Sequence, residues 1–497
     1  MDIAVSSIDV FILILYVVLT VFIGWRVSKG ISGFEDFAVA GRSFGPFMLA
    51  ATISATNFST WSLVGKPGLV YNAGVSVSWI ALNAMACVLG AVIFVPIYRK
   101  LKYNTMSEIF EDRYDGRVRG LISVIWILAD TLNRYGVTVY AASVILGLLL
   151  GVDIVWMVLA MSLLIVIYTY LGGLRSVVIT DAIQFIFMFA GLFIGGAYIF
   201  SQLGGWTGVV ESVPENITKW VPSVENANGW PWIIAMTLLG FPYFVTSQFV
   251  MQRGLAAKSV NVAKWGMILA AIIAIPIAIL EILPGLAAHS ILSREIVSSV
   301  NPDMVGPLVY LELLPVGFLG IFFASLMAAG ISTADSALAG SSALVTEDFY
   351  KKWRPGKDDT HYLKVSRIAT LILAAIGTSW ALITPMLGGA VDAILNVIAV
   401  TDMPIFVIVC LAIFWRKMKA TAAVISILVG TIGGFLVSVF DVGGIQGLAV
   451  TTATSTLLTL ITGVVLSYII TPTNQHEEKV QKFFEQISSR EEQSTHI

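Results

Sequence analysis

The chain has 497 residues, of which 57% are hydrophobic and only 12% charged, and its formal net charge is −2. Soluble domains carry roughly 25% charged residues, so this composition excludes a soluble enzyme or a nucleic-acid-binding protein and indicates a polytopic helical membrane protein. The two cysteines, Cys87 and Cys410, lie in apolar runs, and the four histidines are scattered, which predicts neither a disulfide framework nor a zinc site.

Apolar runs long enough to cross a bilayer follow one another along almost the whole chain. A helical span needs about 20 apolar residues, and thirteen runs fit that length. Because the runs are continuous rather than alternating, they predict helices and exclude a β-barrel. The predicted spans are residues 8–29, 46–71, 75–98, 119–150, 153–171, 176–203, 231–252, 262–290, 315–346, 366–384, 388–415, 419–440 and 447–471.

The basic residues predict the orientation. With the N-terminus outside, the inside segments hold 25 of the 29 Lys and Arg residues, Arg253 among them, and only Lys219 and Arg294 lie outside. Because cytoplasmic loops carry the excess of Lys and Arg, we expect an N-out, C-in transmembrane domain over residues 1–471. The polar tail, residues 472–497, is expected to be a solvated cytoplasmic segment, with an amphipathic helix around Val480–Ile487 as the alternative.

Two of the predicted spans are interrupted. Residues 54–62 form a polar run followed by Gly-Lys-Pro-Gly at 65–68, and Gly240 and Pro242 interrupt the span 231–252. Unwound backbone at membrane depth lines a cavity or binds an ion, because lipid cannot satisfy free backbone groups. The two interruptions open successive groups of five spans, residues 46–203 and 231–415. An odd number of spans inverts the second group relative to the first, which is typical of a transporter with a central site.

Segments 8–29 and 419–471 are then peripheral helices. The alternative is that the interruptions carry no function, since Gly and Pro are simply commoner in membrane helices than in soluble ones.

Ionisable residues inside spans cost about 3 kcal/mol each on insertion scales and are functional by default. Arg134, mid-way along the span 119–150, could hold a substrate carboxylate through two hydrogen bonds. Asp130, four residues earlier on the same helix face, could neutralise it instead. Asp181 could contribute to an ion site or pair with Arg175 at the cytoplasmic interface. The residues alone leave both pairs of alternatives open.

The span 315–346 holds the densest polar cluster. Ser332, Asp335 and Ser336 recur at i, i+3 and i+4 and share one helix face, with Thr333 beside it. Hydroxyl and carboxylate oxygens, together with carbonyls freed at an unwound helix, are ligands that suit Na+. Small polar residues also serve helix packing, but packing alone does not need a carboxylate.

Several segments, spread over about residues 35–420, resemble signatures of the sodium:solute symporter family and occur in the expected order. They are Gly-Arg-Ser-Phe-Gly at 41–45, Tyr-Thr-Tyr-Leu-Gly-Gly-Leu-Arg-Ser at 168–176, Thr-Asp-Ala-Ile-Gln at 180–184, Gln-Arg-Gly-Leu-Ala-Ala-Lys-Ser at 252–259, Ile-Ser-Thr-Ala-Asp-Ser at 331–336 and Thr-Glu-Asp-Phe-Tyr at 346–350. The resemblance implies an all-α polytopic membrane protein with the five-plus-five inverted repeat of the leucine-transporter type. It also implies Na+-coupled alternating access.

The resemblance also implies the ligands of the ion sites. The sodium site of the family falls on the carbonyls of Ala55, Phe58 and Ala329 and on the hydroxyls of Ser332 and Thr333. A second sodium site of some members falls on Asp181, Asp335 and Ser336. Because Asp335 is an acid where those members have a hydroxyl, this second site is either altered or more negatively charged.

The substrate is less clearly implied, because members of this family carry proline, pantothenate, monocarboxylates, sugars, sialic acid, iodide or choline. Residues 74–81 look like the proline-type subgroup and lack the acid of the sugar carriers, whereas Asn57 stands where proline carriers have Asp. Arg134 falls where sialic acid carriers place a carboxylate-binding Arg. The expected substrate-lining residues are Asn57, Ser59, Thr60, Arg134, Phe241 and Tyr243.

We therefore expect a Na+-coupled importer of a small carboxylate-bearing solute, either a monocarboxylate or an amino acid such as proline. A neutral solute (a sugar or a vitamin) is the alternative, and a channel or a solute sensor is a weaker one. No His, Glu or Cys constellation indicates an enzyme. The expected partners are Na+, the solute and the bilayer of the cell (inner) membrane, without nucleic acid, and with a monomer as the functional unit.

Overall fold

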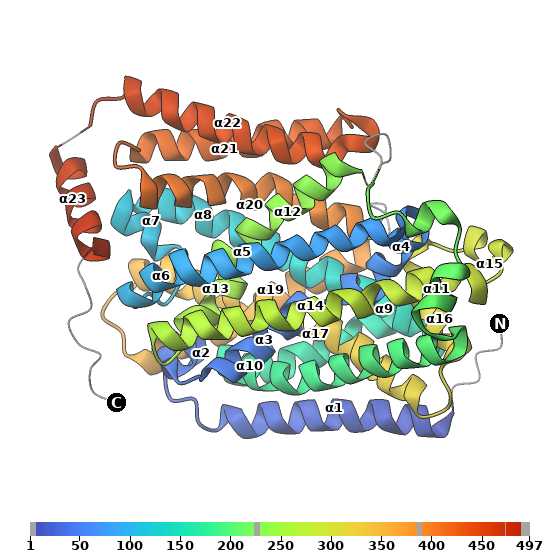
Figure 1. The fold of residues 1–497 in the computed structure, drawn as a ribbon. Helices are drawn as coiled ribbons and strands as arrows, with labels where there is room; N and C mark the ends of the chain where they lie inside the picture. Colours follow the sequence, from blue (N-terminus) through green and yellow to red (C-terminus); the bar gives the residue numbers. More distant parts are fainter. Residues whose placement is uncertain (1–5, 223–228, 385–389, 473, 489–497) are drawn as a thin grey trace.

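The structure, a computed structural model, describes residues 6–222, 229–384, 390–472 and 474–488. In these ranges every regular element is a helix, and no strand is present (Figure 1). A helix satisfies its backbone hydrogen bonds internally, which a membrane requires, and the long apolar runs supply side chains that lipid tolerates. The all-α architecture expected from the sequence is therefore confirmed.

The long helices run roughly side by side (Figure 1). They are α1 (Ser7–Ser28), α8 (Gly116–Leu128), α9 (Thr138–Leu150), α10 (Ile154–Leu203), α12 (Trp230–Val245), α14 (Val260–Ile291), α17 (Phe318–Leu344), α19 (Asp359–Ile383), α20 (Ala390–Phe414), α21 (Ala420–Val439) and α22 (Gly447–Ile469). The remaining helices connect or extend them: α2 (Phe34–Val39), α3 (Pro46–Asn57), α4 (Lys66–Ala73), α5 (Asn83–Leu89), α6 (Val95–Leu101), α7 (Glu108–Arg113), α11 (Gly205–Glu211), α13 (Gln248–Leu255), α15 (Arg294–Ser299), α16 (Val305–Leu313), α18 (Lys351–Trp353) and α23 (Asn474–Ser488).

Among the described residues, ten helices are long and apolar enough to cross a membrane, or eleven if the bent pair α12 and α13 forms one span. The run α10 contains two of the predicted spans, 153–171 and 176–203, and its backbone leaves the helical range between them at Gly173 (φ 51°, ψ −145°). Likewise, the continuous run Trp61–Leu101 passes through Gly74, where φ is 78°. The count of thirteen and the orientation stay predictions.

The helices α1 and α21–α22 lie at opposite edges of the molecule, and the elements of residues 46–415 fill the space between them (Figure 1). The helix α17 lies in this interior, and all but two of its 27 side chains are buried. Its small residues permit close packing: a Cβ on Gly330 would approach Ala142 Cβ to 2.7 Å. The helix α17 therefore packs closely against α9, which carries Ala142.

Both predicted helix interruptions are present. The helix α3 ends at Asn57, Phe58 adopts a non-helical conformation (φ −80°, ψ 81°), and helical turns resume at η2 (Trp61–Gly65). The helices α12 and α13 are bent by 44° relative to each other. Pro242 lacks an N–H, and its carbonyl accepts both Thr246 N–H (3.0 Å) and Ser247 N–H (2.9 Å), so the chain turns out of the helix there.

Residues 474–488 of the polar tail form a helix that packs on the core, so the expectation of a solvated segment was wrong for this part of the tail. The helix α23 covers Asn474–Ser488, so it begins six residues before the alternative predicted around Val480–Ile487 and ends one residue after it. Phe483 is 1% exposed, and Phe484 and Val480 are also buried against the helical core. The apolar side of this otherwise charged helix packs on the helical core, as is typical of an amphipathic helix.

Candidate functional site

The polar face of α17 meets the end of α3 at the first interruption. Ser332 Oγ donates a hydrogen bond to the carbonyl of Ala55 (3.0 Å) and lies 3.4 Å from the carbonyl of Ala329. Thr333 Oγ1 donates to the carbonyl of Thr56 at 3.3 Å. The structure thus brings together four of the five residues predicted to ligate Na+, with Thr56 as a neighbour that the sequence did not single out.

Phe58, the fifth predicted ligand, is the first residue after α3, and its N–H is bonded to the carbonyl of Ser54 (2.8 Å). The carbonyls near the end of α3 have no following helical turn, so they are open to other partners. Uncharged hydroxyl and carbonyl oxygens around a buried point suit a monovalent cation. Such a site would replace the hydration shell of the ion without adding charge.

A second polar cluster lies beside it, and Arg253 is at its centre. The guanidinium lies 2.8 Å from Asp181 Oδ2 and donates to Thr52 Oγ1 (2.7 Å), Thr56 Oγ1 (2.6 Å) and Ser336 Oγ. Arg253 and Asp181 are fully buried. Arg253, which the sequence analysis counted in a cytoplasmic segment, therefore does not face solvent, because α13 continues to Leu255 and carries the side chain inward.

The partner of Asp181 is consequently Arg253 and not Arg175, the neighbour that the sequence offered. Arg175 instead donates to the carbonyl of Gly30 (3.1 Å) and lies 3.8 Å from Asp36. Within the described residues, Asp181 Oδ1 has no hydrogen-bond partner. One oxygen of Asp181 is thus engaged by Arg253 and Thr52, and the other remains available.

Asp335 completes the second cluster. It accepts hydrogen bonds from the Tyr168 hydroxyl and from Ser336 Oγ (3.0 Å). With both Asp335 and Asp181 ionised, two carboxylates would face one guanidinium. The structure brings Asp181, Asp335 and Ser336 together as the sequence predicted, and the excess of acidic oxygens is compatible with one additional cation.

A central cavity of about 230 Å³ lies between the two interrupted helices. Five of the six predicted substrate-lining residues line it: Asn57, Ser59, Thr60, Arg134 and Tyr243. The Tyr243 hydroxyl donates to the carbonyl of Thr56 (3.1 Å), which links this wall to the first ion site.

Phe241 is not among the residues that line the cavity. Its ring packs against Phe406 with 5.7 Å between centroids. Residues 239, 240, 243 and 244 line the cavity, so Phe241 lies on another face of α12.

Arg134 lies in η5 (Ala129–Val137), a stretch of wide π-helical turns of the kind that often marks functional sites. Its guanidinium forms ion pairs with both Asp130 (2.5 Å) and Asp402, and the three side chains are almost completely buried. The Phe249 ring lies 4.8 Å from the same guanidinium. The pairing with Asp130 that the sequence left open is therefore present, and Asp402 is a second partner from α20, 268 residues away.

Another cation on the cavity wall is also paired. Lys66 contacts Glu281 of α14, and both side chains are at most 7% exposed. In contrast, Ser54 Oγ, Thr60 Oγ1 and Asn83 Oδ1 are buried atoms of cavity-lining residues without a hydrogen-bond partner among the described residues. Asn83 lies in the segment 75–98 and was not predicted. Each of these atoms therefore lies in the wall of the cavity with hydrogen-bonding capacity that no described residue uses.

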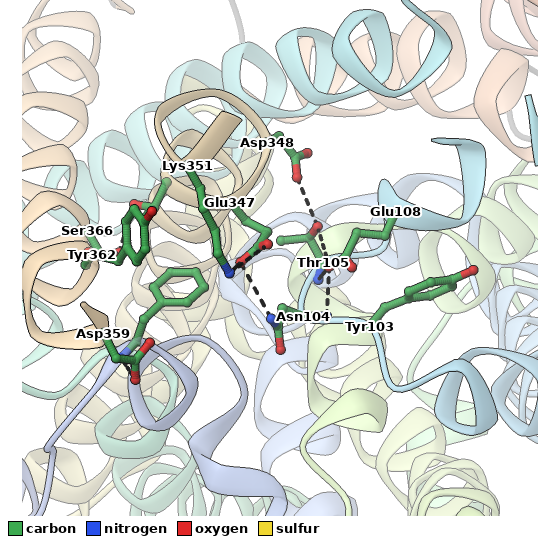
Figure 2. A network of polar contacts seen from close by, with 12 residues as sticks. Tyr103, Asn104, Thr105, Glu108, Glu347, Asp348, Lys351, Asp359, Tyr362 and Ser366 are labelled. Atoms are coloured by element: carbon green, nitrogen blue, oxygen red, sulfur yellow. Dashed lines mark hydrogen bonds and ion pairs between the residues drawn. The ribbon is translucent and has the colours of Figure 1, made fainter. Parts of the chain in front are cut away.

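A polar network ties residues 103–108 to η8 (Val345–Tyr350) at the end of α17 (Figure 2). Asp348 accepts hydrogen bonds from Thr105 Oγ1 (3.1 Å), Ser107, Ser123 and Arg119. Glu347 accepts from Lys351 (3.1 Å) and from Asn104 Nδ2 (3.5 Å). The segment 346–350, one of those that resemble the family signatures, thus fixes the position of residues 103–108, which lie between the predicted spans 75–98 and 119–150.

The chain is similar in sequence to known proteins. The family model described as the sodium:solute symporter family matches residues 37–430. The sodium/glucose cotransporter of Vibrio parahaemolyticus is 28% identical over 461 residues, covering 85% of this chain and 83% of that protein. Sodium/glucose cotransporter 4 of Danio rerio is 27% identical, covering 86% and 71%.

Two solved structures are similar in fold. One is a Na+-coupled sialic acid symporter in a substrate-bound outward-open state, with a TM-score of 0.81, 21% identity, and coverage of 94% of this chain and 98% of that one. The other is Mhp1, a transporter of the nucleobase-cation-symport-1 family, with a TM-score of 0.60, 13% identity, and coverage of 90% and 98%.

Proposed function

Because the chain belongs to the sodium:solute symporter family, we propose that it imports a small neutral, hydroxyl-rich solute together with Na+ through the central cavity. The Na+ binds to the carbonyls of Ala55, Phe58 and Ala329 and the hydroxyls of Ser332 and Thr333. Asp181, Asp335 and Ser336 hold a second cation. We further propose that the protein works as a monomer in the cell membrane.

The pairing of Arg134 carries the choice of a neutral solute. A carboxylate substrate would need a guanidinium with free N–H donors, but this one already faces Asp130 and Asp402. Displacing either acid would leave a buried charge without its partner, which typically costs about 3–5 kcal/mol. This arrangement lends no support to the carboxylate-bearing solute expected from the sequence.

The rest of the cavity wall supports the same choice. Lys66 is neutralised by Glu281, whereas Ser54, Thr60 and Asn83 present hydrogen-bonding atoms without partners among the described residues. A solute with several hydroxyl groups satisfies such atoms without bringing in a charge. The relatives named above are sodium/glucose cotransporters, and a human sodium/myo-inositol cotransporter is 25% identical.

Thermal unfolding of the purified protein tests the substrate class. Sugars, polyols, monocarboxylates and amino acids are added singly, each with Na+ or with K+ in its place. We expect a neutral polyhydroxylated compound to raise the Tm when Na+ is present and not when K+ replaces it, because ligand binding stabilises the folded state. Uptake of the same compound into proteoliposomes should need an inward Na+ gradient. Stabilisation by monocarboxylates only would contradict the proposal and restore the carboxylate alternative.

A further inference from the structure

A second cavity, of about 730 Å³, lies far from the central one, where α23 meets the start of α21 and the end of α22. In Figure 1, α23 lies across one end of the molecule, beside the ends of α21 and α22. Three cationic side chains line this cavity: Arg416, Lys417 and Lys419. The proposed transport cycle uses none of these residues.

The charges on this wall are only partly compensated. Arg416 and Lys417 are exposed and form no ion pair with a described residue. Their described contacts are with aromatic rings: Arg416 lies 4.7 Å from the Phe484 ring, and Lys417 lies 5.3 Å from the Tyr468 ring. Glu477 and Glu485 of α23 also line the cavity, so the cations outnumber the carboxylates by one.

The backbone adds to this positive potential. The helix α21 begins just after Lys419 without a side-chain cap and without an acidic residue in its first turn. Its first N–H groups therefore point out of the helix end next to the three cations, and helix N-termini attract anions. Lys419 Nζ is held by the carbonyls of Ser467 (2.6 Å) and Ile470, which fixes the end of α22 beside this helix start.

One face of α22 leads from this cavity into the membrane. Leu457, Ile461, Val465, Tyr468 and Ile469 are all exposed, with Ile469 68% exposed at the end next to the cavity. Their successive spacings of four, four, three and one place them along one side of the helix. An acyl chain can lie along this apolar face while a phosphate occupies the basic cavity, whereas a free phosphate ion would use only the cavity.

We propose that this cavity binds the phosphate headgroup of an anionic phospholipid, whose acyl chains lie along the exposed face of α22. Basic pockets between membrane helices are typical sites for such headgroups. The bound lipid would also hold α23 in place, because Arg416 lines the cavity and also contacts the Phe484 ring of that helix. This inference does not depend on the identity of the transported solute.

The test follows the Tm of the full chain in a neutral detergent as lipid is added. Phosphatidylglycerol should raise the Tm saturably, and phosphatidylcholine or inorganic phosphate at the same concentrations should not. In Arg416→Gln/Lys417→Gln, half-saturation should need about 30-fold more phosphatidylglycerol, because each surface cation contributes about fivefold in affinity. Lys417→Gln alone, which loses only a ring contact among those described, should need about fivefold more.

The control is Lys357→Gln/Lys364→Gln, which removes two exposed cations elsewhere on the chain and should respond as the wild type does. Native mass spectrometry should retain phosphatidylglycerol on the wild type and lose it in the Arg416/Lys417 variant. An unchanged response of that variant would overturn the proposal. An equal effect of phosphatidylcholine would refute recognition of the anion, and an equal effect of inorganic phosphate would identify a free ion as the ligand.

Discussion

The Arg253 guanidinium lies 2.8 Å from the Asp181 carboxylate, and neither side chain is reached by solvent. Three further hydroxyls, those of Thr52, Thr56 and Ser336, accept from the same guanidinium. This pair joins α13, which follows the second interruption, to α10 and to the end of α3. It therefore connects the helix after the second interruption to the helix that ends at the first, beside the proposed ion sites.

Breaking this pair should be costly. Asp181→Asn or Arg253→Gln leaves a buried charge without its partner and should destabilise the protein by about 3–5 kcal/mol. The double variant should be less destabilised than the sum of the two, because it removes both charges together. Thermal unfolding of the four proteins measures this coupling, and strict additivity would contradict a direct pair.

The proposed Na+ ligands on α17 should control the sodium dependence of transport. Ser332→Ala or Thr333→Ala removes one oxygen and should raise the Na+ concentration for half-maximal uptake by about tenfold, which corresponds to about 1.4 kcal/mol. Ser342→Ala is the matched control, because among the described residues that hydroxyl bonds only to the carbonyl of Ala339 in its own helix. Uptake with unchanged Na+ dependence in both site variants would remove these residues from the ion site.

The pairing of Arg134 makes a gain-of-function prediction. Asp402→Asn frees part of the guanidinium, so monocarboxylates should compete with solute uptake about tenfold better than in the wild type. Glu312→Gln, which neutralises an exposed acid that forms no ion pair within the described chain, serves as the control. If monocarboxylates already compete strongly in the wild type, Arg134 binds carboxylates despite its two partners.

The network of Figure 2 makes a prediction about pH. Burial raises the pKa of Glu108, with Arg119 opposing and Glu347 adding to the rise, although its Oε1 accepts N–H groups from Asn104 and Thr105 at 2.8 Å each. A carboxyl whose pKa is raised on folding favours the folded state below its ordinary range, and that contribution is lost as pH rises. Relative to the wild type, Glu108→Gln should therefore gain Tm between about pH 4 and pH 7.

Glu111 provides the opposite control for this pH series. Burial works against its ionisation, but hydrogen bonds from Lys352 and Arg119 hold the pKa of Glu111 below its ordinary value. Its contribution to stability is present above the ordinary range and lost as pH falls through the lowered pKa. Glu111→Gln should therefore lose Tm relative to the wild type at pH 7 and less at pH 4. If the Tm difference from the wild type changed with pH in the same direction for both variants, the opposite pKa directions given for Glu108 and Glu111 would be contradicted.

Gly173 should not tolerate a side chain. Its φ of 51° lies in the left-handed region, and a Cβ would approach the Phe37 ring to 2.5 Å. Gly173→Ala should lower stability by about 1–3 kcal/mol through strain and overlap. Gly120→Ala in α8, where a Cβ meets nothing within 4 Å, should be neutral or slightly stabilising. Equal Tm values for the two variants would contradict the left-handed backbone and the close contact with Phe37 at Gly173.

The sequence predicted the interruptions well, because polar runs, Gly and Pro act locally on the backbone. It also predicted that Ser332 and Thr333 would meet the end of α3, although that expectation came from the family resemblance. The role of Arg253 could not be predicted, since counting cations treats an Arg near a span end as a marker of the aqueous side. One additional helical turn placed this residue in the interior.

Contacts between residues far apart in the sequence could not be predicted either. Asp130 is visible four residues before Arg134, but Asp402 reaches the same guanidinium from a helix 268 residues further along. No local pattern indicates that contact, and it changes the inferred solute from a carboxylate to a neutral compound. Phe241 and Tyr243 are two residues apart in one helix, yet only Tyr243 lines the cavity, because neighbouring side chains diverge around the helix axis.

The two acids around Arg134 also have an electrical consequence. With both ionised, this group carries one net negative charge in the membrane interior. If the empty cavity opens first to one side and then to the other, as the proposed import requires, that charge changes its place in the transmembrane field, which is worth up to about 2.3 kcal/mol per 100 mV. The resting voltage would then bias the side to which the empty protein opens, and voltage jumps without solute would produce transient currents.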